Sequence, residues 1–344
     1  MPLLVFGGTK HDVWISASLA AIMGLMGGYI IIALALRYPS QTLIQYSQQI
    51  LGRWTGRFLG FIYIGFFILM ASVSARDFAE LLLNYTLETL PISIYLGVII
   101  LTAAYALFTG LSSIGRFAEL IVPFILIVII FGIIASYPNA DYLPSLPLKH
   151  DFKYLLNEAL LELPSLGMAS SLLMLIPMLN EKVRAKRNLL ISIAIAGAAT
   201  ILVATIIVGV LGPYETTSIN YPFFFTFQQI TILPSIPHFD MLFIFAWISV
   251  SFLTISIYYF IAAVSIQQLF SKKSYRPFIA PIGVLIIVTA IFAFPTFHEF
   301  KQFLWLNRVG IAAIPLDFLI PSILLLLSCF KHAHHQKTRG KLQG

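Results

Sequence analysis

Nine long apolar segments recur along the chain, and each is long enough to cross a lipid bilayer as a helix. A helix that spans about 30 Å of hydrocarbon needs roughly 20 apolar residues. The segments show none of the apolar–polar alternation of membrane β-barrel strands. Only 10% of the residues are charged, which excludes a soluble globular domain of ordinary composition. The sequence therefore predicts an all-α integral membrane protein with one membrane domain, residues 1–330, and spans near residues 13–36, 58–83, 92–110, 115–136, 158–179, 189–211, 240–268, 278–295 and 309–329.

The positive charges predict how these segments are oriented. Lys and Arg accumulate in cytoplasmic loops. One assignment puts fifteen of the 21 Lys and Arg residues on one side, five on the other, and Arg76 within a span. It makes the basic tail, residues 331–344, cytoplasmic. The same loops explain the net charge of +7, so we expect these charges to face anionic lipid and expect no nucleic-acid partner.

The amino-terminal segment does not fit an even number of spans. Met1–Gly8 is apolar but too short to cross a bilayer, and nine spans would leave the visible amino end outside the cell. We interpret this segment as the outer end of a first helix that is missing from the sequence. A tenth helix would place both ends of the chain in the cytoplasm.

Three connecting segments are long enough to have structure or function of their own. Residues 37–57 predict an amphipathic helix at the cytoplasmic interface, with Leu43, Ile44 and Ile50 toward the lipid. The outer loops, residues 137–157 and 212–239, are rich in proline. They either gate the protein or contact a partner, or they only connect spans.

Ionisable residues inside a span are costly and usually face a cavity or a partner, which makes them the first candidates for function. In the second span, Ser72, Arg76, Glu80 and Asn84 share one helical face, and Asp77 points about 100° away. Arg76 and Glu80 can form an ion pair within this helix. Arg76 and Asp77 could instead reach the outer interface, whereas Glu80 favours an interior, water-lined position.

The span near 158–179, which we expect to begin after Asn157 as its N-cap, contains a helix breaker near the middle of the membrane. Pro164 lacks a backbone donor and Gly167 allows unusual dihedral angles. A break here would expose the backbone of Ser165, Leu166 and Gly167, as in the interrupted helices with which transporters bind small ligands. The alternative is a simple proline kink.

The span near 240–268 carries a polar stripe. Its members are spaced seven, four, three and four residues apart and therefore share one helical face: Asp240, Trp247, Ser251, Thr254 and Tyr258. Such a stripe is typical of hydrogen bonding between membrane helices. It also suits the wall of a pocket, with Thr254 and Tyr258 near the middle of the span.

Asp317 is the carboxylate deepest in the predicted membrane, about 13 Å into the last span. Pro315 and Pro321 loosen the helix around it. Asp317 could therefore bind amides that these prolines free or cap a break in the helix, or it could be a protonatable site.

No cofactor, metal or catalytic site is expected. His332, His334 and His335 lie in the basic tail, where a solvated position is more typical than a metal site. No nucleophile, base and orienting residue are grouped as a hydrolase requires. The sequence therefore does not predict an enzyme.

Considered in order, the motifs resemble the B-subunit family of bacterial spore germination receptors, the spore permeases. That family belongs to the amino acid–polyamine–organocation (APC) superfamily. The resemblance covers nearly the whole chain and is carried by His11–Ser16, Arg37–Pro39, Leu51–Trp54, Arg76–Glu80, Leu90-Pro91, Gly115–Glu119 with Pro123, and His238–Asp240 with Trp247.

The resemblance implies a LeuT-like fold of two inverted five-helix repeats, with a pocket for an amino-acid-sized ligand built from helices 1, 3, 6 and 8. With the missing helix counted, the ligand-binding candidates fall on helices 3, 6 and 8: Arg76, Glu80, Ser165, Leu166, Gly167, Thr254 and Tyr258. Asp77 and Asp317 are the candidates for a proton or polar pathway.

The function implied is that of a germinant receptor subunit in the spore inner membrane. It would bind a small nutrient such as an amino acid and trigger germination through A-type and C-type partner subunits. A secondary amino-acid transporter of the same superfamily is the first alternative. A truncated permease fragment without function is the second.

Overall fold

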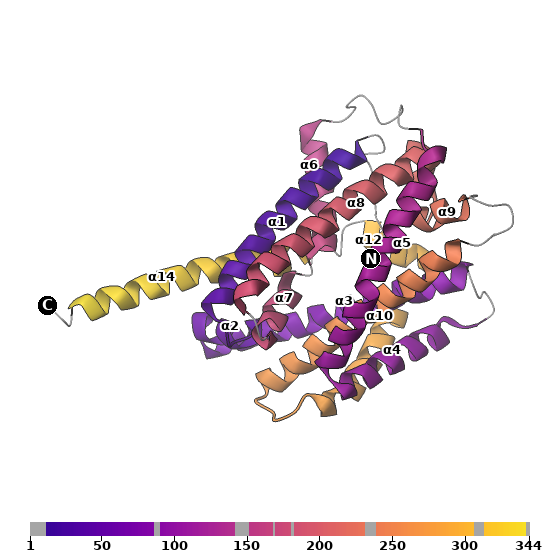
Figure 1. The fold of residues 1–344 in the computed structure, drawn as a ribbon. Helices are drawn as coiled ribbons and strands as arrows, with labels where there is room; N and C mark the ends of the chain where they lie inside the picture. Colours follow the sequence, from indigo (N-terminus) through magenta and orange to yellow (C-terminus); the bar gives the residue numbers. More distant parts are fainter. Residues whose placement is uncertain are drawn as a thin grey trace.

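The structure, a computed structural model, describes residues 12–85, 90–141, 151–167, 169–179, 182–230, 239–305 and 313–341, and this part of the chain contains helices and no strand. Six of the helices are long and apolar enough to cross a membrane. They are α1 (Val13–Arg37), α3 (Arg53–Tyr85), α4 (Ile92–Thr109), α5 (Leu111–Ser136), α8 (Lys182–Ser218) and α10 (Asp240–Leu269) (Figure 1). The prediction of a helical membrane protein is confirmed, and Met1–Gly8 lies outside the described residues.

A seventh span would be a bent one. It would combine α11 (Ile279–Phe292), which follows the 3-10 turn η4 (Arg276–Phe278), with α12 (Phe297–Trp305). These helices are long and apolar enough to cross a membrane only when they are taken together, and the chain bends by 100° between them. α12 was not predicted, because the expected span ended at residue 295. The count of nine spans stays a prediction.

The predicted spans near 158–179 and 309–329 are irregular helices. The first is divided into α6 (Phe152–Gly167), α7 (Ala169–Leu175) and the 3-10 turn η3 (Ile176–Met178). α6 already begins at Phe152, so Asn157 lies inside the helix and the prediction that it is the N-cap is wrong. The second consists of a π-helical turn, η5 (Pro315–Leu319), followed by α14 (Ile320–Lys341), which continues through the predicted basic tail. Pro315 starts the π turn, as expected where a proline removes a regular helical hydrogen bond.

The predicted interfacial helix exists as α2 (Leu43–Leu51), but its orientation differs from the prediction. A capping box between Thr42 and Gln45 begins it. Leu43 and Ile44 are completely buried in the protein core and Ile50 packs against that core, so the prediction that they face lipid is wrong. The apolar face of α2 covers α3 and α14, which provide a drier surface than the membrane interface.

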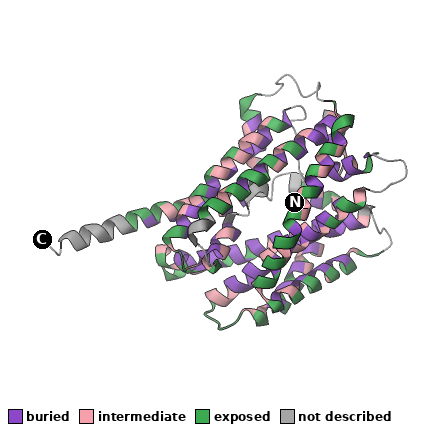
Figure 2. Ribbon diagram, in the orientation of Figure 1, coloured by how far each residue is buried: buried purple, intermediate pink, exposed green. Residues whose placement is uncertain are grey.

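The helices form two packed groups. α1 packs against α6, α7 and α8, whereas α3, α4, α10 and α11 pack against one another. The short helix α9 (Pro222–Gln228) joins α8 to α10 and contacts both, and the far end of α14 extends away from the bundle (Figure 1). Buried residues line the surfaces between the helices, and exposed residues cover their outer faces, as Figure 2 shows. The buried ionisable groups lie at these contacts.

Candidate functional site

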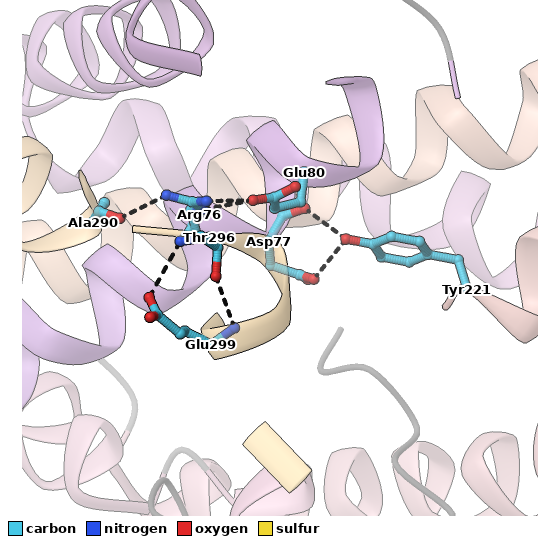
Figure 3. A network of polar contacts seen from close by, with 7 residues as sticks. All are labelled: Arg76, Asp77, Glu80, Tyr221, Ala290, Thr296 and Glu299. Atoms are coloured by element: carbon cyan, nitrogen blue, oxygen red, sulfur yellow. Dashed lines mark hydrogen bonds and ion pairs between the residues drawn. The ribbon is translucent and has the colours of Figure 1, made fainter. Parts of the chain in front are cut away.

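Arg76 and Glu80 form an ion pair inside the bundle. Nη2 of Arg76 lies 2.5 Å from Oε1 of Glu80, and Nε donates to the same oxygen at 2.7 Å. Nη1 donates to the carbonyl oxygen of Ala290 in the last turn of α11, at 3.2 Å (Figure 3). Both side chains are buried between the helices. The pair keeps two charges away from lipid, which is the condition for retaining them within a span.

Asp77 points to a different neighbour, as its helical position predicts. The hydroxyl of Tyr221 donates to the Asp77 backbone carbonyl at 3.3 Å and to its carboxylate at 3.4 Å (Figure 3). Tyr221 is the residue before α9, and its ring packs edge-on against Trp247 of α10, with 5.8 Å between ring centroids. One tyrosine therefore ties the predicted outer loop to α3 and α10.

The start of α12 lies beside the Arg76–Glu80 pair in Figure 3. The hydroxyl of Thr296 accepts from the Glu299 backbone N–H at 3.2 Å, and the Glu299 carboxylate accepts from the Thr296 N–H at 3.4 Å. This reciprocal pair starts α12 after the bend that follows Ala290. Within α12, Lys301 donates to the side chain of Asn220 at 2.9 Å. The residue next to Tyr221 is therefore also fastened to the bundle.

Asp317 holds the beginning of α7. Its Oδ1 accepts the backbone N–H of Ser170 at 2.9 Å and the hydroxyl of Ser170 at 2.5 Å. The neighbouring carbonyl of Leu316 accepts from Tyr63 of α3 at 2.7 Å. The ring of Tyr63 also packs against Phe67, which in turn packs against Tyr258 of α10. The Asp317 carboxylate therefore binds a backbone amide in the first turn of α7, and a role of Asp317 as a protonatable site stays a prediction.

The polar stripe of α10 faces α3. Trp247, Ser251, Thr254 and Tyr258 are buried, and Asp240 at the helix start is half-buried. Tyr258 lies 6.4 Å from Phe67 between ring centroids. Gly60 of α3 lies next to Leu269 of α10, so the two helices run antiparallel. Thr254 is consequently one turn from Tyr258, in the direction of Trp247.

Two polar clusters thus border the contact between α3 and α10. The outer cluster comprises Arg76, Asp77, Glu80, Tyr221 and Trp247, and the inner cluster comprises Tyr63, Ser170, Tyr258 and Asp317. Phe67 and Asp77 are ten residues apart on α3, which corresponds to roughly 15 Å along the helix. Thr254 lies between the two clusters along α10, because it is seven residues after Trp247 and four before Tyr258.

The structure brings some predicted site residues together and leaves others apart. Arg76 and Glu80 form an ion pair, and Tyr258 is linked to Tyr63 through the ring of Phe67, but Asp77 and Asp317 belong to different clusters. The side chains of Ser165, Leu166 and Gly167 lie outside the described residues. α6 is described as far as Gly167 and α7 from Ala169 onward, so the break predicted at residues 164–167 stays a prediction.

Three partners of the site were not predicted: Ser170, Tyr221 and the Ala290 carbonyl. Ser170 could have been found from its place just after the expected break. Tyr221 follows no recognisable pattern in its loop, and a backbone carbonyl has no signature in the sequence. Among the described residues, no group of three His, Cys, Asp or Glu side chains could hold a metal ion. His332, His334 and His335 have no described side chains.

Helices of membrane length with ionisable residues buried between them define a polytopic helical membrane protein. The chain belongs to the spore permease family, described as "Spore germination protein", which it matches over residues 2–298. It is 25% identical to spore germination protein KB of Bacillus subtilis (strain 168), over 98% of this chain and 93% of that protein. It is also 22% identical to spore germination protein YndE of the same strain, over 92% of this chain and 87% of that protein. A third relative from this strain, spore germination protein A2, is 25% identical over 93% of this chain and 87% of that protein.

Proposed function

We propose that this protein is the membrane subunit of a nutrient germinant receptor, and that it binds a small nutrient between α3, α7 and α10. Its relatives KB and A2 are spore germination proteins, which supports a role in germination. The observation that carries the proposal is the pair of polar clusters on either side of Thr254. Ionisable groups are expensive inside a membrane and mark ligand or ion sites when they are retained.

The proposed architecture is the LeuT-like inverted repeat that the family resemblance implies. With α1 counted as helix 2, one packed group contains helices 2, 6 and 7, and the other contains helices 3, 4, 8 and 9. Helices 2, 3 and 4 of one repeat correspond to helices 7, 8 and 9 of the other. Helices 2 and 7 therefore lie in one packed group, and helices 3, 4, 8 and 9 lie in the other. Corresponding helices of the two repeats thus share a group, which supports the proposal of two repeats.

The ligand would lie beside Thr254 and Tyr258 of α10, with the broken helix α6–α7 as a second wall. Arg76 and Glu80 would bound the site on the outer side, and Asp317 on the inner side. Arg76 already has three hydrogen-bonding contacts, so we assign it to shaping the site rather than to direct binding. Backbone groups of residues 165–167 and the Thr254 hydroxyl are the proposed ligand contacts.

The proposed receptor includes A-type and C-type subunits and resides in the inner membrane of the spore, with the carboxyl terminus in the cytoplasm. Binding would shift the arrangement of α6 and α7 relative to α3 and α10. The partner subunits would respond to that shift. The charge asymmetry of the loops supports the orientation.

Secondary transport of an amino acid is the alternative. It is favoured by one observation, the division of α6 from α7, because interrupted helices at membrane depth are typical of transporters. The receptor and the transporter would share one ligand site and differ in whether the ligand crosses the membrane.

Vesicles containing the purified full-length chain distinguish the two functions. Radiolabelled amino acids are added one at a time, and both binding to the protein and uptake into the vesicle lumen are measured. Saturable binding without uptake, together with loss of nutrient-induced germination in spores that lack the gene, supports the receptor. Saturable uptake supports the transporter, and the absence of both binding and uptake contradicts the site itself.

A further inference from the structure

We propose that the end of the bundle at which α3 begins and α10 ends binds the phosphate headgroup of an anionic phospholipid. The site consists of Arg53 and Arg57 on α3 and of Lys272 and Lys273 after α10. This proposal does not depend on the function proposed above.

The first turns of α3 present a row of cations beside a row of apolar side chains. Arg53, Arg57 and Phe61 follow one another at intervals of four residues, and so do Trp54, Phe58 and Ile62. Residues four apart lie on the same face of a helix. Trp54 is 84% exposed and Phe58 is 70% exposed. A charged edge and an aromatic edge therefore adjoin where the span begins.

The end of α10 brings two lysines to the same place. Phe270 contacts Phe61, with 5.9 Å between ring centroids, so the exposed Lys272 and Lys273 follow directly after a contact with α3. The backbone N–H of Lys272 donates to the Gln267 carbonyl at 2.8 Å, and that of Ser271 donates to the Gln268 carbonyl at 3.2 Å. With Ser271 at a φ of 52°, this is a Schellman cap, which fixes where the lysines emerge.

Three other cations on the side of the predicted cytoplasmic loops have partners within the protein. Arg37 donates to Ser328, Lys331 donates to the Gln49 carbonyl, and Lys186 lies over the ring of Tyr29.

By contrast, the side chains of Arg53, Arg57, Lys272 and Lys273 make no hydrogen bond or ion pair among the residues described. Four cationic side chains without a protein partner attract an external anion, which would complete the site.

The aromatic edge identifies the anion as a lipid. Trp side chains favour the boundary between headgroups and hydrocarbon, and clustered Arg and Lys beside a span attract anionic headgroups. A phospholipid places its phosphate on the four cations and its acyl chains along Trp54 and Phe58. Free phosphate or an acidic peptide would leave that apolar edge uncovered.

Brominated lipids, which quench tryptophan fluorescence on contact, provide a direct test. The full-length chain is placed in nanodiscs that contain either brominated phosphatidylglycerol or brominated phosphatidylcholine at equal bromine density. The chain has four tryptophans, so subtracting the signal of the Trp54→Phe variant isolates Trp54. We expect phosphatidylglycerol to quench Trp54 more strongly than phosphatidylcholine.

The variant R53Q/R57Q should lose this excess, because about 1 kcal/mol per cation corresponds to a roughly fivefold change in local occupancy. Arg116→Gln is the matched control, since Arg116 is an exposed cation at the start of α5 that also has no partner among the described residues. It should keep the excess. Added inorganic phosphate should not remove the excess in the original chain.

Equal quenching by the two lipids in the original chain would overturn the proposal and leave an acidic protein segment as the partner of these cations. An excess that persists in R53Q/R57Q, or that inorganic phosphate abolishes, would overturn it as well.

Discussion

Ser170 donates both its backbone N–H and its hydroxyl to the same carboxylate oxygen of Asp317, at 2.9 and 2.5 Å. The contact joins the second residue of α7 to the π-helical turn η5, which is far away in the sequence. Asp317 therefore stabilises the first turn of α7 through a direct contact with η5. Any change at Asp317 is expected to act on α7.

The first prediction concerns this contact. Asp317→Ala should destabilise the protein by about 1–3 kcal/mol, because it leaves the buried N–H and hydroxyl of Ser170 without an acceptor. Asp317→Asn should cost less, since the amide oxygen can still accept both bonds. Thermal unfolding of the purified protein in detergent measures the difference. Thr102→Ala, on an exposed face of α4, is the control, and equal losses for both Asp317 variants would contradict the assignment.

The second prediction concerns the Arg76–Glu80 pair. Removal of either partner should destabilise the protein by roughly 3–5 kcal/mol, because an uncompensated charge stays buried. Replacement of both, as in R76M/E80L, should cost much less than the sum of the single changes. Unfolding of the two single variants and the double variant measures this coupling. Additive losses would show that the ion pair is not formed within the bundle.

The third prediction uses a glycine of α1. A methyl group added at Gly27 would overlap the ring of Phe318, next to Asp317 in η5. Gly27→Ala should therefore lower the unfolding temperature and displace the turn that holds Ser170. Gly65→Ala in α3 is the control, because nothing lies within 4 Å of the added methyl group there. That substitution should be neutral or stabilise by up to about 1 kcal/mol. The same effect for both variants would contradict the packing of η5 on α1.

The sequence was sufficient to predict the membrane helices and the contacts within one helix. Arg76 and Glu80 are four residues apart, so helical geometry alone places them together. The four buried residues on one face of α10, Trp247, Ser251, Thr254 and Tyr258, follow from the same helical spacing.

Contacts between distant segments could not be predicted in this way. Leu43 and Ile44 were assigned to lipid because an apolar face indicates burial without indicating what buries it. Tyr221 reaches Asp77 from a loop, and no periodicity marks a loop residue for such a contact. The 100° bend before α12 likewise depends on how α11 and α12 pack in three dimensions.

The fourth prediction separates the two functions of Tyr221. Tyr221→Phe should cost about 0.5–1.5 kcal/mol at most, because its hydrogen bonds to Asp77 are long, at 3.3 and 3.4 Å. Tyr221→Ala should cost roughly 3–5 kcal/mol, because it also removes the ring that packs against Trp247. Unfolding of both variants tests this order, and an equal loss would mean that the ring contributes nothing to the outer cluster.

The central claim, that a nutrient binds beside Thr254 between the two polar clusters, is tested most directly by germination of spores that carry Thr254→Val. The substitution preserves the shape of the side chain and removes one hydroxyl, which is worth about 0.5–1.5 kcal/mol in a hydrogen bond. The account predicts that this variant needs a roughly threefold to tenfold higher nutrient concentration for half-maximal germination, at an unchanged protein level. Spores that carry the control variant Thr102→Val should germinate at the same nutrient concentration as the original spores. A nutrient response identical to that of the original protein would contradict the site.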